Sequence, residues 1–381
     1  MEFITGAWLF DGRSQARHGG CLVVDDGRIV SVDDSVPDPL PSGSRHAHFE
    51  NGFVMPGFVD AHNHLELGKG NDELMMAQSL QEIINRSRVN AKADLLCGVT
   101  TMRTLGEREY VDVKLGKEIE GGLMPGPRLI TGGPWITPSH GHGSYALGAD
   151  IADGPHEVRV AVRRHIKAGT AWVKLMVSGG IADSGNLSAS YYSAEEIRAG
   201  VEEAHNHGVG VAVHCYGGPG ALMSIEAGVD TIEHGTRITD PRLFDLMAEN
   251  NVSIVFTTGI VYGDPRLKES TPAAVQAALA SGANVAIGAD CNHGRFGFEA
   301  ECAVEYGATA HQALVAMTHG AARACRVADE VGTLEPGKRA DVLVVDGNPI
   351  DDIRRLRDVL LVMKAGATVL EADAPSTTAA A

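Results

Sequence analysis

Eight short apolar runs that alternate with helix-like segments are the feature that most constrains the fold of this chain. Helix signals lie between the runs, such as the capping-box pair Ser193 and Glu196, with Gly208 at the end of the same segment. Eight strand–helix units within about 270 residues match the size of a (β/α)8 TIM barrel. The strands are predicted at residues 53–62, 100–105, 128–132, 172–177, 209–215, 231–235, 252–257 and 284–290.

An open, doubly wound sheet would also accommodate this alternation. No GxGxxG motif follows the first run, which disfavours a dinucleotide-binding sheet. The sequence therefore favours an α/β protein of the barrel type.

The two ends of the chain have a different pattern. Short β-type runs separated by Asp-Gly and Asn-Gly turns occupy the first fifty residues, and similar runs return near the C-terminus. We expect a small β-sandwich domain built from residues 1–55 and 331–372, and a barrel over residues 56–330. Residues 373–381 are small and polar and are predicted to be a disordered tail.

Composition limits the partners of the protein. The chain of 381 residues has 49 acidic and 32 basic side chains, for a net charge of −17, which argues against nucleic acid and anionic membranes. No apolar run approaches the roughly 18 residues of a membrane span. The beginning lacks the pattern of a secretory signal, and the six cysteines lack CxxC pairing, so we expect reduced thiols and a cytoplasmic protein.

Polar residues suited to metal binding lie at the ends of four of the eight predicted strands and inside a fifth. In a barrel the C-terminal ends of the strands converge on one face, so these side chains are expected to meet there. They are His62 and His64 on the first strand, Lys174 on the fourth, His214 on the fifth, His234 on the sixth and Asp290 on the eighth.

The HxH pair is weak evidence by itself. Random placement of the histidines would give about 0.7 such pairs, and the chain contains four. Residues 205 and 207 end a polar helix, and residues 46 and 48 lie in the terminal sheet region, where a surface position explains them. His62 and His64 differ because they follow an apolar strand and have counterparts on other strands. A shared metal site is therefore predicted.

Lys174 lies inside an otherwise apolar strand. Lysine is rare in such a place because removing an ammonium from water is costly. A buried ion pair is one explanation. The other is that the amine is neutral and has reacted with carbon dioxide to form a carbamate, an anion able to bridge two cations.

Taken together, the motifs resemble the metal-dependent amidohydrolase superfamily, and within it the imidazolonepropionase and prolidase-like branch. That branch includes Xaa-Pro and Xaa-Arg dipeptidases and N-acyl amino acid hydrolases. The resemblance extends from about residue 6 to 370 and is carried by "VMPGFVDAHNHL", "GVTTMR", "GPRLITGG", "KLMVSGGI", "GVDTIEHGT" and "GTLEPGKRADVLV".

The resemblance implies two divalent metal ions. Zn²⁺ suits the donor set best, and Mn²⁺ or Co²⁺ are chemically acceptable. A bridging water would lose a proton and attack the carbonyl of an amide, peptide or cyclic amide, with Asp290 as general base and then acid. A small molecule or short peptide is the expected substrate, and relatives are often homo-oligomers. One ion would be held by His62, His64, carboxylated Lys174 and Asp290, and the other by Lys174, His214 and His234.

Departures from the branch concentrate around the expected substrate pocket. Tyr216 stands where many relatives have a second histidine, and Thr104 follows Arg103 where an Asp is common. His140 is added beside the loop residue His142, and the segment after the seventh strand is short. These changes leave the ligands intact and put the substrate in doubt.

Several residues are candidates for substrate binding. His142 could hydrogen-bond the substrate, and Tyr191, Tyr192 and Tyr216 could line its pocket. A substrate carboxylate would find a cation in Arg295, which follows Asp290 closely, or in Arg103. For His293 we expect a role behind the ligands or toward the substrate.

Two other functions remain open from the sequence. The same metal site could hydrolyse a lactone or catalyse a cyclisation or dehydration in a biosynthetic pathway. A catalytically silent binding homologue is the third hypothesis, and the retention of every ligand argues against it.

Overall fold

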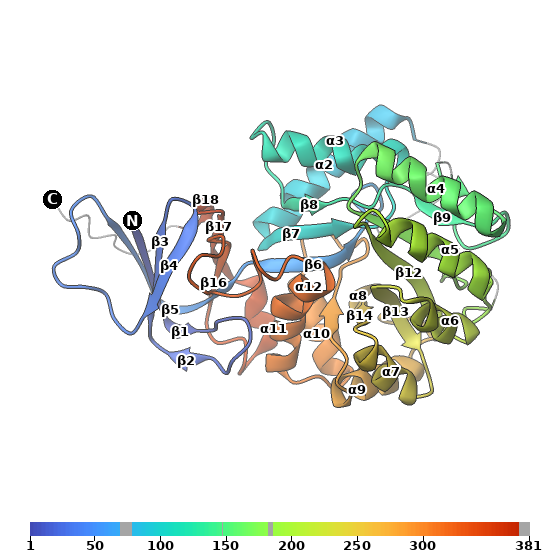
Figure 1. Ribbon diagram of the computed structural model, residues 1–381. Helices are drawn as coiled ribbons and strands as arrows, with labels where there is room; N and C mark the ends of the chain where they lie inside the picture. The colour runs from blue at the N-terminus through green and yellow to red at the C-terminus, as the bar shows by residue number, and fades with distance from the viewer. Residues whose placement is uncertain (69–77, 147, 182–185, 373–381) are drawn as a thin grey trace.

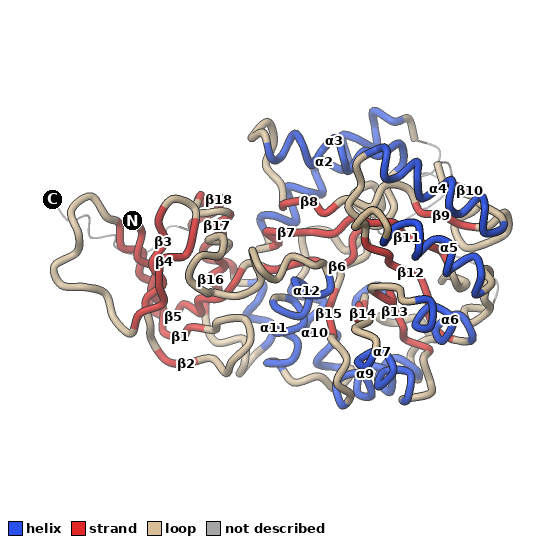
Figure 2. Tube along the Cα trace, viewed as in Figure 1, coloured by secondary structure: helices blue, strands red, loops and turns tan. Residues whose placement is uncertain are grey.

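The computed structural model describes residues 1–68, 78–146, 148–181 and 186–372. Its larger part contains eight parallel strands, each near a position that the sequence predicts, with helices on their outer side (Figures 1 and 2). The expected tail at residues 373–381 lies outside the described residues. The strands are β6 (Phe58–Asn63), β7 (Val99–Thr104), β8 (Arg128–Ile130), β11 (Trp172–Met176), β12 (Gly210–Gly217), β13 (Thr231–Arg237), β14 (Ser253–Phe256) and β15 (Val285–Ile287).

Backbone hydrogen bonds link the two groups of parallel strands. One group runs β6-β7-β8, and the other runs from β11 to β15 with β9 (Trp135–Thr137) and β10 (Asp150–Ile151) added at its edge. The amides of Ala171 and Trp172 donate to the carbonyl of Thr131, which joins β8 to β11. At the other seam the amide of Asp290 donates to the carbonyl of His62 at 2.8 Å. This is the arrangement of a (β/α)8 barrel, as the sequence predicts.

Helices follow the strands where the sequence places its capping signals. In α5 the Ser193 hydroxyl accepts from the amide of Glu196, and the Glu196 carboxylate accepts from the amide of Ser193, as predicted. The helices are α2 (Leu80–Leu96), α3 (Val111–Glu120), α4 (Gly154–Ala168), α5 (Ala194–His205), α6 (Pro219–Ala227), α7 (Arg242–Glu249), α8 (Thr258–Val261), α9 (Ser270–Ala280), α10 (Gly297–Glu305), α11 (Ala310–Met317) and α12 (His319–Ala324), with 3-10 turns η1 (Arg108–Tyr110) and η2 (Ile353–Arg357).

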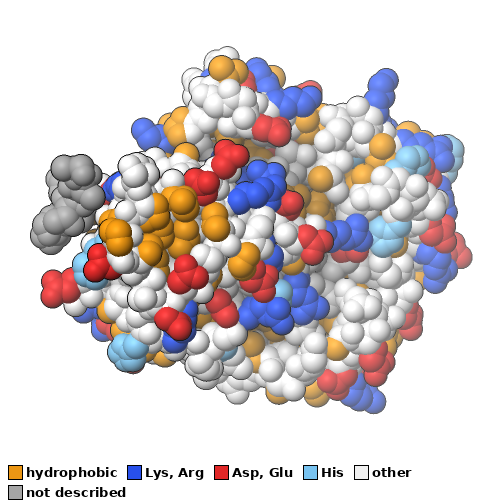
Figure 3. Space-filling view, turned by 60° about the vertical axis from the view of Figure 1, so that its left-hand side comes forward, with side chains coloured by type: hydrophobic (Ala, Val, Ile, Leu, Met, Phe, Trp, Pro, Cys, Tyr) orange, Lys and Arg blue, Asp and Glu red, His pale blue; other side chains and the backbone are white. Residues whose placement is uncertain are grey.

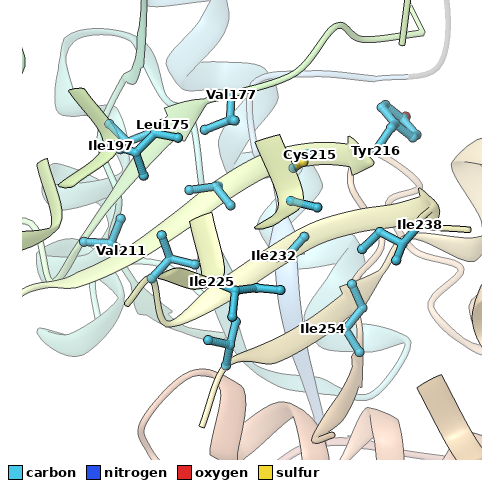
Figure 4. Packing of buried hydrophobic residues seen from close by; sticks show 14 of the residues in the cluster. Leu175, Val177, Ile197, Val211, Cys215, Tyr216, Ile225, Ile232, Ile238 and Ile254 are labelled. Atoms are coloured by element: carbon cyan, nitrogen blue, oxygen red, sulfur yellow. The ribbon is translucent and has the colours of Figure 1, made fainter. Parts of the chain in front are cut away.

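Side chains alternate between the two faces of the barrel strands. Leu175 and Val177 belong to the large core cluster that also contains Ile197 of α5, and Figure 4 shows these side chains close together. Trp172 belongs instead to the cluster inside the barrel. Because side chains two apart on a strand share a face, Lys174 points inward with Trp172.

Strands from both ends of the chain pair in one eight-stranded sheet, at the left of Figure 1. Strand β5 lies parallel to β1 and antiparallel to β16, so it joins N-terminal to C-terminal strands. The strands are β1 (Glu2–Leu9), β2 (Arg17–His18), β3 (Cys21–Asp25), β4 (Arg28–Asp33), β5 (Arg45–Pro56), β16 (Val342–Asp346), β17 (Val359–Lys364) and β18 (Ala367–Glu371).

The single strand predicted over residues 53–62 is two strands, and this corrects the prediction. β5 ends at Pro56 in the terminal sheet, and β6 begins at Phe58 in the barrel. Pro56 has no amide hydrogen to continue a ladder. At Gly57 a Cβ would lie 2.5 Å from the Thr100 hydroxyl, so the chain turns where only glycine fits. The apolar pattern continues across this turn and conceals it.

The surface in Figure 3 carries acidic and basic side chains interspersed over the face turned forward, with a group of hydrophobic side chains on its left-hand part. Within the described ranges, no helix combines the length and the apolar character needed to cross a membrane.

Candidate metal centre

The six predicted ligands meet at the C-terminal ends of the barrel strands. The ring of His234 lies 4.9 Å from that of His62 and 4.5 Å from that of His214, measured between centroids. Asp290 lies within reach of the same group, with one carboxylate oxygen 3.6 Å from Nε2 of His64. Lys174 lines the same cavity.

The tautomers of His62 and His64 leave two lone pairs facing each other. Nδ1 of His62 lies 2.8 Å from a Glu233 carboxylate oxygen, and Nδ1 of His64 lies 3.3 Å from the carbonyl of Gly106. Both partners only accept, so each Nδ1 carries the hydrogen. The two Nε2 atoms, 3.2 Å apart, are therefore both unprotonated. Two such nitrogens beside a carboxylate are a donor set for a cation.

Hydrogen bonds also hold the other two imidazoles, but not through the same nitrogen in each. Nε2 of His214 donates to the carbonyl of Gly179 at 3.1 Å, which leaves Nδ1 as its free acceptor. Nδ1 of His234 lies 2.8 Å from the hydroxyl of Thr257. Burial lowers the pKa of all four imidazoles, to about 3 for His64, so they are neutral as metal ligation requires.

Two of the predicted ligands have unusual backbone conformations. His234 has φ +72° and Asp290 has φ +61°, both in the left-handed region that residues other than glycine rarely adopt. Such conformations cost about 1–3 kcal/mol each and are concentrated at functional sites. His234 lies within β13 and Asp290 follows β15, and both side chains line the cavity.

Lys174 is fully buried, and the described residues give its amine neither a hydrogen bond nor an ion pair. Burial lowers the pKa of the amine to about 8, although the carboxylates of Glu233 and Asp290 oppose the shift. A buried ion pair, the simpler explanation from the sequence, is therefore not what the structure contains. A larger share of neutral amine suits reaction with carbon dioxide.

The carboxylate of Asp290 completes the cluster. Its ligand oxygen and the ligand nitrogens of His62 and His64 all lie within 4.8 Å of one another. Burial raises the pKa of this carboxyl to about 6, and Lys174 opposes the shift. A carboxyl that titrates near neutrality can take up and return a proton.

A cavity of about 280 Å³ opens above the cluster. His142 and Tyr216 both line it, as expected. The ring of Tyr216 stacks on that of His234 with centroids 4.9 Å apart, and the ring of His142 lies 4.5 Å from that of His214. A side chain at Gly180 would collide with the ring of His142, so glycine there admits the histidine.

Three expected substrate residues do not line the cavity, and this corrects the expectation. Arg103 is fully buried against Trp172 and pairs with Glu233 behind the ligands. Tyr192 belongs to the core cluster, and its hydroxyl donates to the carbonyl of Ala152. Arg295 lines a separate cavity beside α2 and η2, because its side chain turns onto Phe298.

His293 lies behind the ligands. Its Nδ1 contacts Asp94 at 2.7 Å, and its Nε2 faces the carbonyls of His64 and Leu67. Of the two roles considered for it, the structure supports the one behind the ligands. His140 and Tyr191 contact each other edge-on, 5.7 Å apart, and do not line the cavity.

Two residues of the site were missed by sequence reasoning. Glu233 holds His62 and Arg103 from inside the barrel, and Trp135 forms a wall of the cavity. The signal for Glu233 was a carboxylate within the apolar run of β13, comparable to Lys174 in β11. Trp135 gave no signal, because its strand was not among the eight predicted.

Similarity to known proteins agrees with this geometry. The ochratoxinase of Aspergillus niger is 27% identical over 93% of this chain and 83% of that protein. An imidazolonepropionase of Nocardia farcinica is 29% identical over 89% of this chain and 88% of that protein. The crystal structure of a Xaa-Pro dipeptidase with bound methionine in its active site superposes with a TM-score of 0.89 at 28% identity, covering 96% of this chain and 99% of the other.

The model of the amidohydrolase family matches residues 53–369, a range that includes all six candidate ligands. The chain therefore belongs to the amidohydrolase family, and it is a hydrolase that acts on carbon–nitrogen bonds.

Proposed function

We propose that this protein is a binuclear metal-dependent amidohydrolase that cleaves an amide bond in a small molecule or short peptide. The observation that carries the proposal is the pair of unprotonated Nε2 atoms of His62 and His64, 3.2 Å apart beside Asp290. Relatives named ochratoxinase, imidazolonepropionase and Xaa-Pro dipeptidase support hydrolysis as the reaction.

Two divalent ions, with Zn²⁺ as the best match to imidazole and carboxylate donors, would occupy this centre. His62, His64 and Asp290 would hold one, and His214 and His234 the other, with Lys174 as a carbamate shared by both. Bound there, the ions would acidify a water and polarise the substrate carbonyl.

Asp290 is proposed as general base and acid. Its second carboxylate oxygen lies 4.0 Å from Nδ1 of His234, and Asp290 lines the cavity. From there it would accept the proton of the attacking water and return it to the leaving nitrogen. Tyr216 and His142 would donate hydrogen bonds to the substrate, since both line the cavity beside the ligands.

None of the six cysteines, all of which lie among the described residues, forms a disulfide bond. Cysteines without disulfide bonds are typical of a reducing compartment, so we propose the cytoplasm as the place of this activity.

The experiment measures metal content and turnover together. Metal analysis of the purified protein is expected to give two equivalents of metal per chain. Intact-protein mass spectrometry, carried out without acid, is expected to show the added mass of one carbon dioxide. A panel of N-acyl amino acids, dipeptides, cyclic amides and lactones should then show amide cleavage. Cleavage of lactones alone would favour the lactonase hypothesis, and an empty site without turnover would contradict the proposal.

A further inference from the structure

The walls of the cavity carry fewer polar and charged side chains than its floor, which holds the candidate ligands. Beside the ligands the floor carries two polar side chains, His142 and Tyr216. The remaining described residues of the lining include no Asp, Glu, Lys or Arg. They are Leu67, Gly68, Trp135, Gly143, Tyr145, Met176, Ile181, Ile260 and Cys291.

Trp135 is held rigidly as one of these walls. Its indole Nε1 donates to the carbonyl of Gly143 at 3.2 Å, so its only polar atom is already paired. The ring meets His64 edge-on at 5.9 Å and packs with Met176. Because a Cβ at Gly106 would collide with the indole, glycine is needed for this position. The tryptophan therefore presents hydrocarbon surface to a ligand.

Charged groups of a substrate would lose hydration in this cavity without compensation from the described residues of its walls. The arginine closest in chain to Asp290, Arg295, lies at another cavity, and Arg103 is buried behind the ligands. Arg266 near the mouth is bound to Asp264 and to the carbonyl of Ile181. Among the described lining residues, a substrate carboxylate held away from the metal centre would reach hydrogen-bond donors but no cationic side chain. An ammonium would meet apolar walls, at a high cost of desolvation.

We infer that the substrate is an uncharged amide with an apolar or aromatic group on at least one side of the scissile bond, and not a zwitterionic dipeptide. This inference rests on the proposed amide hydrolysis and specifies its substrate class. The cavity volume of about 280 Å³, at the lower end of ligand pockets, suits a small molecule. Apolar walls would contribute binding energy through burial of the aromatic group.

The first test compares three compounds that share an aromatic framework. They are N-(2-phenylethyl)benzamide, which is neutral, N-benzoyl-L-phenylalanine, which adds a carboxylate, and L-phenylalanyl-L-phenylalanine, which is a zwitterion. With the metal-loaded enzyme, kcat/KM is expected to be at least about tenfold higher for the neutral amide than for the dipeptide, because each uncompensated charge is costly to bury. Equal or higher kcat/KM for the dipeptide overturns the inference and leaves amide hydrolysis intact.

If none of the three is cleaved, the proposed function is in question and the inference is tested separately. Calorimetric titration of the metal-loaded wild-type protein then gives the affinity for each compound. Tighter binding of the neutral amide supports the inference, and equal or tighter binding of the dipeptide overturns it.

A charge placed on the wall provides the second test. Ile260, on α8 and lining the cavity, is replaced in Ile260→Arg, with Ile260→Gln as a matched polar control without charge. The ratio of kcat/KM for N-benzoyl-L-phenylalanine to that for the neutral amide should rise about tenfold in the arginine variant and stay near the wild-type ratio in the control. An unchanged ratio in a folded arginine variant, verified by its circular dichroism, would contradict the assignment of this wall.

Discussion

The carboxylate of Glu233 accepts a hydrogen bond from Nδ1 of His62 at 2.8 Å, and both side chains are completely buried. The other oxygen of Glu233 accepts from Arg103, which lies over the ring of Trp172. This chain of contacts fixes the tautomer of His62 and aims its Nε2 at the candidate centre. Buried partners of this kind orient metal-binding histidines.

Glu233→Gln should weaken metal binding. The amide oxygen of the glutamine can accept a hydrogen bond from His62, but the neutral amide cannot form the ion pair with Arg103. Without that ion pair the side chain at position 233 is no longer held in place, and the imidazole of His62 loses its orientation. We expect metal affinity to fall by about 10- to 100-fold, the usual effect of losing such a partner. Competition with a chromogenic chelator measures the affinity. Glu202→Gln on the exposed face of α5 is the control, and equal affinities in the two variants would contradict the role of Glu233.

Lys174→Ala should lose most of its bound metal, because the variant cannot form a carbamate. Added acetate or propionate should restore part of the metal content, since a small carboxylate can occupy the vacated space. Elemental analysis before and after addition measures the effect. Lys167→Ala, at an exposed position of α4, should retain metal. Full metal content in Lys174→Ala would show that the amine is not a ligand.

Asp290→Asn should retain the fold and lose turnover. An amide cannot accept the proton of the attacking water, and general-base catalysis contributes about 10²–10⁴-fold to a rate. We expect kcat to fall within that range when the assay is corrected for metal content. Asp264→Asn is the comparison variant, and its kcat is expected to stay near that of the wild type. In the wild type Asp264 pairs with Arg266 and is not among the residues that line the cavity. A loss of less than tenfold would assign proton transfer to another group.

The buried carboxyl of Glu299 is expected to make the free energy of unfolding depend on pH. Its carboxylate accepts from the amide of Gly259 and from Asn292, and burial raises its pKa from 4.5 to about 7. The folded state therefore holds the proton more tightly than the unfolded state. The stabilisation is complete below pH 4.5 and is lost as the pH rises through 7, by about 3 kcal/mol in total.

Glu299→Gln should flatten this dependence, because its amide does not titrate. Unfolding by urea at pH 5 and pH 8 measures the change in the free energy of unfolding, and the difference between the two pH values should be smaller in the variant. Glu305→Gln, exposed on the same helix, should behave like the wild type. Parallel pH profiles for Glu299→Gln and wild type would refute the assignment.

Residues next to the predicted strands show how far sequence reasoning extends. His214 and Asp290 were found because each ends an apolar run, and parallel strands must bring such ends to one face. Arg295 follows Asp290 by five residues, yet its side chain turns onto Phe298 in another cavity. Loop direction after a strand depends on backbone angles such as the φ of +61° at Asp290, which the pattern of apolar residues does not encode.

The sequence by itself determined the alternation of strands and helices, the buried position of Lys174 and the six candidate ligands. These follow from periodicity and from the cost of burying charge, which are local properties. Only the tertiary structure decided which side chains meet. It places Glu233 against His62, pairs Arg103 with Glu233 away from the cavity, and makes Trp135 a wall of the cavity. Those contacts join strands far apart in the chain, and packing of the whole barrel sets their distances.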